Sequence, residues 1–268
     1  MASTVIGAKG FVGRRLSAAL EREGQPPWRP EKGDPQLFQR DLGVVFYCAG
    51  LTADYDRRPF DAVDAHSSLV SDLLRTARFE RLIYLSSTRL YDGLAVAEAA
   101  EDQPLSFDPT DPRRTYDLSK ALGENLVITR SEGRGAVARL ANVFDWQAGA
   151  PGFLSEWLIR SRTEHHLHLD SSPHVARDYI HLDNVVSALI GMAGAPDPGI
   201  VNVASGELVT NGEIAEVFEA AGWRVEFARD ACPAAPPNAS VAKLAGLGVR
   251  APPVRDVIAG FLAKGGVS

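Results

Sequence analysis

The segment Thr4-Val5-Ile6-Gly7-Ala8-Lys9-Gly10-Phe11-Val12-Gly13 is the most informative part of the sequence. A short apolar run passes through a GxxGxxG turn into residues 11–23, where apolar side chains recur at helical intervals. Glycines spaced in this way permit a tight turn, let the backbone approach a pyrophosphate, and let the helix pack closely on the strand. The helix dipole adds positive charge at the same turn. The segment therefore predicts a strand, a phosphate-binding turn and a helix.

Further apolar runs are short enough for buried strands, and helical spacing recurs between them. We expect strands at residues 44–48, 81–85, 136–140 and 200–203, and helices at 63–77, 116–129 and 184–192, the last capped by Asp183. This alternation is typical of an α/β protein with a doubly wound parallel sheet. From residue 151 onward, this alternation of predicted strands and helices gives way to mixed helices and loops. We expect a dinucleotide-binding domain over 1–150 and a smaller substrate-binding lobe over 151–268, with some segments returning to the first domain.

The stretch between the first helix and the second predicted strand is short for a complete nucleotide-binding half. Residues 24–43 contain the prolines Pro26, Pro27, Pro30 and Pro35. Because proline cannot donate a hydrogen bond to a sheet, at most a short edge strand near Trp28 is expected. The adenosine side of the fold is therefore abbreviated.

Glu31 stands about 20 residues after the glycine turn, where an acidic residue commonly binds the adenosine ribose. Glutamate there favours NAD, whereas nearby basic side chains could accept the extra phosphate of NADP: Arg14, Arg29 and Lys32. A solvated loop carboxylate is the alternative interpretation of Glu31. The choice between NAD and NADP stays open.

Tyr116 and Lys120 are four residues apart, so they share one face of a predicted helix. A nearby ammonium favours the phenolate and lowers the pKa of Tyr116 from about 10 toward the range useful for proton exchange. The hydroxyls of Ser87 and Thr88 follow the strand at 81–85, at the edge where such sheets bind substrates. The strand at 44–48 leads in the same way to Ala49 and Gly50, which we expect at the cofactor.

These motifs occur in a characteristic order, and the chain resembles the extended short-chain dehydrogenases/reductases over nearly its whole length. This family of NAD-dependent epimerases, dehydratases and ketoreductases acts on nucleotide sugars. The resemblance rests on Gly7/Gly10/Gly13, Ser87 four residues before Tyr91, Tyr116-x-x-x-Lys120, Arg139-x-x-Asn142-Val143-Phe144 and Arg177-Asp178-Tyr179-Ile180-His181. It implies a Rossmann-type fold, NAD or NADP as cofactor and a nucleotide sugar as substrate.

The resemblance also implies roles for individual residues. Tyr116 would be the acid/base, Lys120 would hold the nicotinamide ribose and tune Tyr116, and Ser87 would bond the reacting oxygen. Asn142 and Arg177 match positions that contact the substrate nucleotide or its diphosphate. A planar guanidinium suits phosphate oxygens, although an ion pair between Arg177 and Asp178 or a core carboxylate is the alternative.

Some residues depart from the family pattern. Dehydratases carry an acidic pair where this chain has Thr88 and Arg89, so dehydration is disfavoured. Asp92 replaces a glycine usual after the Tyr91 position, and Asp145-Trp146 replaces Gly-Pro. These replacements put ordinary sugar specificity in doubt.

Epimerase chemistry is narrowly favoured, with an NAD(P)H-dependent ketoreductase close behind. An epimerase must retain its reduced cofactor through each turnover, and the abbreviated residues 24–43 weaken the grip on adenosine. A third interpretation is a catalytically silent relative that only binds a nucleotide. The presence of Ser87, Tyr116 and Lys120 together argues against it.

Composition excludes several classes. With 45% apolar residues the chain can build a core, and a net charge of −6 provides no basic field for nucleic acid. No apolar window is long enough for a membrane span, and no basic leader precedes Val5, so we expect a cytoplasmic protein. The histidines near residue 166 lack partners at metal-ligand spacing, and no metal is expected.

Two further expectations concern thiols and assembly. Cys48 and Cys232 lie in very different surroundings and are expected to be free thiols. By resemblance to the family, the helices at 63–77 and 116–129 would form the contact of a homodimer.

Overall fold

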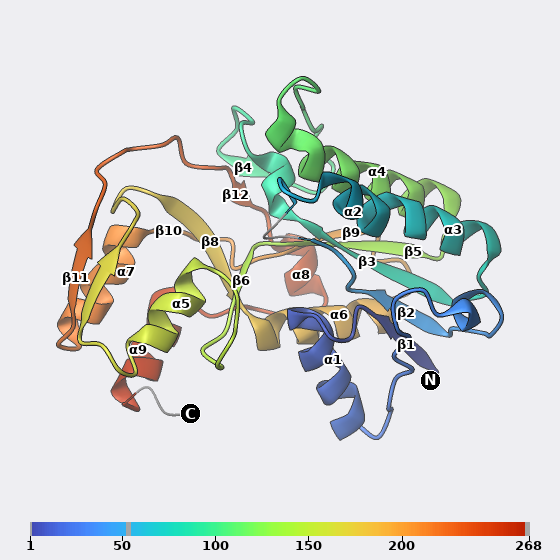
Figure 1. Ribbon diagram of the computed structural model, residues 1–268, viewed down its shortest axis with the longest axis horizontal. Helices are drawn as coiled ribbons and strands as arrows, with labels where there is room; N and C mark the ends of the chain where they lie inside the picture. Colours follow the sequence, from blue (N-terminus) through green and yellow to red (C-terminus); the bar gives the residue numbers. More distant parts are fainter. Residues whose placement is uncertain (1, 52–54, 266–268) are drawn as a thin grey trace.

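A computed structural model of the chain describes residues 2–51 and 55–265. Within these ranges, a sheet of five parallel strands forms the centre of the larger part of the molecule, on the right in Figure 1. The strand order is β1 (Ser3–Ile6), β2 (Val44–Tyr47), β3 (Arg81–Ser87), β5 (Gly135–Leu140) and β9 (Ile200–Val203). The strands are apolar runs with both faces covered, and all four residues of β2 are buried. The predicted α/β fold and its strands are confirmed.

Helices cover both faces of this sheet (Figure 1). On one face α1 (Phe11–Arg22) packs against α6 (Leu182–Gly194), and on the other lie α2 (Pro59–Val63), α3 (Leu69–Thr76) and α4 (Thr115–Arg130). The helix predicted at 63–77 is divided, because a π-helical turn at Asp64–Ser68 separates α2 from α3. Such turns are rare and are frequent at functional sites.

The cap of α6 differs from the sequence prediction. The helix begins at Leu182, and the Nδ1 atom of His181 accepts the hydrogen bond from the backbone N–H of Asp183. The expectation that Asp183 is the cap is therefore wrong, because Asp183 already lies in the first turn. Its carboxylate instead pairs with Arg15 on α1, with 2.8 Å between Nε and Oδ1.

The abbreviated segment keeps only a trace of an edge strand. Trp28 forms an isolated bridge with Thr4 of β1, and the backbone N–H of Val5 donates to the carbonyl of Trp28 at 2.8 Å. The chain then passes through a short 3-10 helix, η1 (Pro35–Phe38), and enters β2. The expectation of at most a short edge strand near Trp28 is confirmed, since only this one bridge forms.

The remaining elements gather in a smaller group, on the left in Figure 1. It contains β6 (Asn142–Phe144), α5 (Phe153–Arg160), β7 (His166–Leu169), β8 (Ala176–His181), β10 (Leu208–Thr210), α7 (Asn211–Ala220), β11 (Arg224–Phe227) and α9 (Val254–Ala263). A separate core of buried side chains, among them Trp157 and Phe218, holds it together. Two small elements, β4 (Glu98–Ala99) and β12 (Asn238–Ala239), pair beside the main sheet, and α8 (Ala242–Gly246) packs on β9. The domain boundary at residue 150 stays a prediction.

A buried ion pair joins the carboxyl end of the main sheet to α4. Arg139 on β5 binds Glu124 on α4 through two nitrogens, with 2.7 Å between Nη2 and Oε2, and both side chains are buried. The Nη1 atom of Arg139 also donates to the Tyr91 hydroxyl at 2.7 Å, and Tyr91 donates to Asn202 of β9 at 2.8 Å. Each buried charge is therefore compensated by a partner from another element.

Replacing one partner of this pair should destabilise the protein strongly. Arg139→Met leaves the Glu124 carboxylate buried without its cation, and we expect the free energy of unfolding to fall by about 3–5 kcal/mol. The double variant Arg139→Met/Glu124→Leu removes both charges and should recover much of that loss. Urea unfolding of the variants measures both effects, and equal losses in the single and double variants would contradict this account.

Candidate active site

The glycine turn packs against the loop that follows β2. Gly7 has a positive φ of +84°, and a β carbon at this position would lie 2.7 Å from the backbone nitrogen of Ala49. A β carbon on Gly13 would collide with the carbonyl of Gly7. Only glycine allows both approaches, so the turn, Ala49 and α1 lie together as predicted.

The turn presents the start of α1 in a form suited to an anion. Gly10 is the N-cap and has no side chain to bind the first amides of the helix, which belong to Phe11, Val12 and Gly13. Within the described ranges no side chain caps this helix. The cradle therefore fits the pyrophosphate of NAD or NADP, because free N–H groups and the helix dipole both favour phosphate.

Glu31 lies beside this turn. Its carboxylate pairs with Lys9 of the glycine motif, with 2.6 Å between Oε2 and Nζ, and both side chains are exposed. Arg29 is paired with Glu21. The placement suits a ribose contact and equally a solvated carboxylate, so the role of Glu31 stays a prediction.

Ser87 and Tyr116 meet at the carboxyl end of β3. The Ser87 hydroxyl oxygen accepts from the backbone N–H of Arg89 at 3.1 Å. The same hydroxyl lies near the phenol of Tyr116 and favours its ionised form. Burial raises the pKa of Tyr116 to about 12, while the Ser87 hydroxyl and the charge of Arg89 oppose this rise. The two predicted residues therefore lie at one site, and their catalytic roles stay predictions.

Lys120 lies one helical turn further, deeper in the protein. Its Nζ donates to the carbonyl of Leu85 at 2.8 Å, and a β carbon on Gly50 would lie 3.3 Å from Nζ. Burial lowers the pKa of Lys120 to about 7, against the opposing charge of Glu124. The structure therefore brings Lys120 and Gly50 together, as expected for two residues at one cofactor.

His66 is a buried residue of this site that the sequence analysis missed. Its Nε2 accepts from the backbone N–H of Leu51 at 3.2 Å, so Nδ1 carries the proton and donates to Ser119 at 2.8 Å. The ring stands edge-on to Tyr116 with 5.2 Å between centroids. Nothing in the sequence singles out His66 except its place in a predicted helix, and its location in the π-helical turn is visible only in the structure.

The predicted substrate residues are distributed along the neighbouring strands. Asn142 donates to the backbone carbonyl of Asp178 at 2.9 Å, and Thr88 donates to that of Leu140 at 3.4 Å. Arg177 lies over the ring of Phe153 at 5.4 Å, and its buried Nη1 has no hydrogen-bond partner among the described residues. The alternative pairing with Asp178 is not formed, since Asp178 accepts hydrogen bonds from residues 205 and 206 instead.

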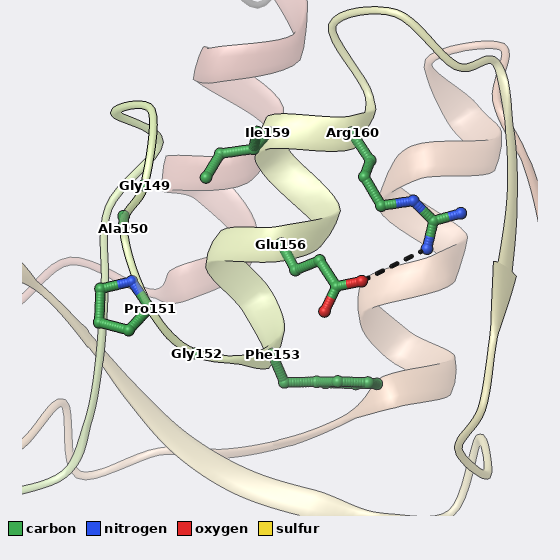
Figure 2. Close-up of a pocket in the computed structure, with 8 residues that line it drawn as sticks. All are labelled: Gly149, Ala150, Pro151, Gly152, Phe153, Glu156, Ile159 and Arg160. Carbon is green, nitrogen blue, oxygen red and sulfur yellow. Dashed lines mark ion pairs between the residues drawn. The ribbon is translucent and has the colours of Figure 1, made fainter. Parts of the chain in front are cut away.

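A surface hollow of about 650 Å³ lies beside α5, separate from the residues predicted to act. Figure 2 shows its wall, where Glu156 and Arg160 form an ion pair of 3.7 Å. The lining residues are Gly149, Ala150, Pro151, Gly152, Phe153, Glu156, Ile159 and Arg160. One lining residue, Phe153, carries Arg177 on its ring.

The cysteines, the histidines near residue 166 and the helices were also subjects of sequence predictions. Cys48 and Cys232 are not joined in a disulfide. His166 and His168 lie on β7 beside Glu226, and residues 2–51 and 55–265 contain no group of three ligand side chains that could hold a metal ion. None of the helices in these ranges is long and apolar enough to cross a membrane.

Comparison with known sequences identifies the family. A family model described as "NAD dependent epimerase/dehydratase family" matches residues 35–204, more than half of the chain. The chain belongs to this family. The resemblance to extended short-chain dehydrogenases/reductases is thereby confirmed.

Two relatives of this chain are named as reductases. The first, a "Probable dTDP-4,6-dihydroxy-2-methyloxan-3-one 4-ketoreductase" of Streptomyces antibioticus, is 31% identical over 140 residues, 47% of this chain and 46% of the relative. The second, a "dTDP-4-dehydrorhamnose reductase" of Streptomyces griseus, is 26% identical over 168 residues, 58% of this chain and 53% of the relative. The chain thus matches about half the length of these relatives.

A solved structure with the same fold superposes on almost the whole of this chain. "MoeE5 in complex with UDP-glucose and NAD" superposes with a TM-score of 0.79 at 22% identity, over 98% of each chain. At this identity the likeness shows the fold, which is the expected Rossmann type.

The buried His66 should make stability depend on pH. Burial, together with the charge of Lys120, lowers its pKa to about 3, so the unfolded chain binds the proton more readily below pH 6.5. The contribution of neutral His66 to the free energy of unfolding is therefore fully present above pH 6.5. It is lost as the pH falls, by about 2 kcal/mol at pH 5. Urea unfolding of the wild type and of His66→Gln at pH 7 and 5 measures it. We expect the difference between the two proteins to shrink at pH 5, and a constant difference would contradict the assignment.

Proposed function

We propose that this protein is an NAD(P)H-dependent ketoreductase that transfers a hydride to a ring carbonyl of a nucleotide-linked keto sugar. The observation that carries the proposal is that Ser87 and Tyr116 lie near each other at the edge of the sheet that also bears the glycine turn and Lys120. A phenol, a serine hydroxyl and an amine gathered beside a dinucleotide cradle suit proton exchange at a carbonyl oxygen.

The chain's own residues would divide the work. When bound, the nicotinamide supplies the hydride. Tyr116 would give its proton to the sugar oxygen, and Ser87 would orient that oxygen with its hydroxyl. Lys120 would bind ribose hydroxyls next to Gly50. Because Tyr116 and Lys120 are 5% and 4% exposed, little water reaches the groups that exchange the proton.

Arg177 and Asn142 would hold the nucleotide part of the substrate. Arg177 has a buried nitrogen with no partner among the described residues, which is costly unless a ligand supplies an acceptor. A diphosphate offers several such oxygens in the geometry of the guanidinium fork.

Two observations favour the reductase over the epimerase. Both curated relatives are named as reductases of dTDP-linked sugars. The adenosine side keeps only the Trp28 bridge, which gives a weaker grip on a cofactor that an epimerase must retain. An epimerase remains the second candidate, because the matching family includes epimerases by name. A cytoplasmic location also remains a prediction.

The reaction type can be tested with purified protein. A ketoreductase is isolated without cofactor and oxidises NADPH or NADH only when a nucleotide-linked keto sugar is added. An epimerase is isolated with bound NAD and interconverts nucleotide sugars without net change in nicotinamide absorbance. Absence of both behaviours over a panel of dTDP-, UDP- and GDP-linked sugars would overturn the proposal.

Tyr116→Phe removes the proposed proton donor. We expect kcat to fall by about two to four orders of magnitude, the usual contribution of a positioned acid or base. Binding of NADPH, measured by its fluorescence, should be nearly unchanged because the ring stays in place. Near-normal turnover in this variant would contradict the assignment of Tyr116.

We also propose that the protein forms a homodimer through α2 and α4. Apolar side chains are exposed on both helices, with Phe60 84% and Leu122 50% exposed, and Val63 and Leu118 lie on the same two helices. Leu122→Arg should therefore yield a monomer in analytical ultracentrifugation. Phe38→Arg, at an exposed apolar residue on η1, is the control and should leave the dimer intact. A monomeric wild type would contradict the proposal.

A further inference from the structure

The turn after Ser87 carries a cation that the proposed chemistry has not used. Arg89 lies in the 3-10 turn η3 (Thr88–Tyr91), and its guanidinium carbon is 5.1 Å from the ring centroid of Tyr116. The same carbon is 4.9 Å from the ring centroid of Tyr55. Arg89 thus lies against the faces of two phenols that are themselves 5.2 Å apart.

A buried carboxylate fixes Arg89 in this place. Asp117 follows Tyr116 on α4, and its side chain has no exposed surface. Its Oδ1 is 3.1 Å from Nε of Arg89, and its Oδ2 is 2.9 Å from Nη1 of Arg114. The two arginines therefore share one buried anion. Asp117, next to Tyr116 in the chain, thus holds Arg89, which lies two positions after Ser87.

Arg89 occupies a better position than Lys120 to act on the phenol ring. The Nζ of Lys120 is directed to the carbonyl of Leu85 and lies 4.9 Å from the ring of Tyr84. Burial lowers the pKa of Lys120 to about 7, so its charge at neutral pH is incomplete. An arginine stays charged under these conditions.

We propose that Arg89 is a positioning residue for Tyr116: held by Asp117, its guanidinium fixes the phenol against Ser87 and stabilises the phenolate. The backbone N–H of Arg89 orients the Ser87 hydroxyl in the same turn, so one residue contacts both Ser87 and Tyr116. The inference rests on the proposed function, in which Tyr116 exchanges the proton.

Several polar and charged groups face Tyr116 and must be considered together. They are Ser87 and Arg89 from the turn after β3, Tyr84 from β3, Tyr55, His66 from the π-helical turn, and Asp117 on α4 itself. Among the groups that act on the ionisation of Tyr116, Ser87 and Arg89 favour the phenolate, whereas Asp117 and Tyr55 oppose it. Removing Arg89 therefore leaves the opposing Asp117 beside the phenol.

The first experiment requires no substrate. The chain has six tyrosines, and labelling with [¹³Cζ]tyrosine reports ionisation of each phenol, with the signal of Tyr116 assigned by its loss in Tyr116→Phe. In folded protein at a pH of about 11.5, we expect the Tyr116 signal of Arg89→Gln to move toward the phenolate position about fivefold less than in the wild type.

The matched control is Arg114→Gln. This variant also leaves Asp117 with a single arginine, so both variants should lose similar stability in urea. Because the ring contact belongs to Arg89, the Tyr116 signal of Arg114→Gln should move nearly as far as in the wild type. Equal titration of Tyr116 in the wild type and Arg89→Gln would overturn the inference, as would an equal effect in both variants.

A kinetic measurement then separates this inference from the proposed function. With an accepted keto sugar, Arg89→Gln should lower kcat about tenfold or more and move the basic limb of the pH profile upward, with the KM for NADPH unchanged. Arg89→Lys should restore part of kcat. An unaltered pH profile would overturn the inference. If Tyr116→Phe retains activity, the proposed function fails, whatever Arg89 does to the phenol.

Discussion

The buried ion pair between Arg139 and Glu124 is the constraint on which the arrangement of the site depends. Arg139 belongs to β5 and Glu124 to α4, and through Tyr91 and Asn202 the network reaches the turn after β3 and the strand β9. Ser87 and Tyr116 lie in the two segments that the network joins. Because each buried charge needs its partner, the helix and the turn cannot shift independently.

Burial sets the chemistry of the candidate site more than any single charge does. It raises the pKa of Tyr116 and lowers those of Lys120 and His66, which is the effect of removing water from around each charged form. His66 is thereby kept neutral and serves as a bridge between Leu51 and Ser119. A dry site in which few groups are fully charged makes the one well-placed guanidinium, that of Arg89, correspondingly influential.

Two parts of the molecule bear on how cofactor and substrate would be held: the adenosine side of the sheet and the smaller group of elements. The chain retains the glycine turn but reduces the neighbouring strand to a bridge at Trp28. A weak hold on adenosine suits a cofactor that is exchanged at each turnover. Arg177, on the strand β8 that faces the smaller core, would instead carry the contact with a substrate diphosphate. The substitutions Thr88 and Arg89, where dehydratases of this family have acidic residues, are consistent with reduction.

Local periodicity and residues close in the chain were enough to predict the parallel sheet, the glycine turn, most of the helices and the place of Tyr116 and Lys120 one turn apart on α4. Which charges meet depends on the folded structure. The contact of Arg89 with Asp117 and Tyr116, the placement of His66 in a π-helical turn, and the cap of α6 by His181 all depend on elements brought together by packing or on where a helix begins. Hydrophobic spacing specifies which face of an element is buried, but not which polar side chain of a distant segment will lie against it. Such pairings follow from the geometry of the folded core, and the position of Arg89 over Tyr116 is one of them.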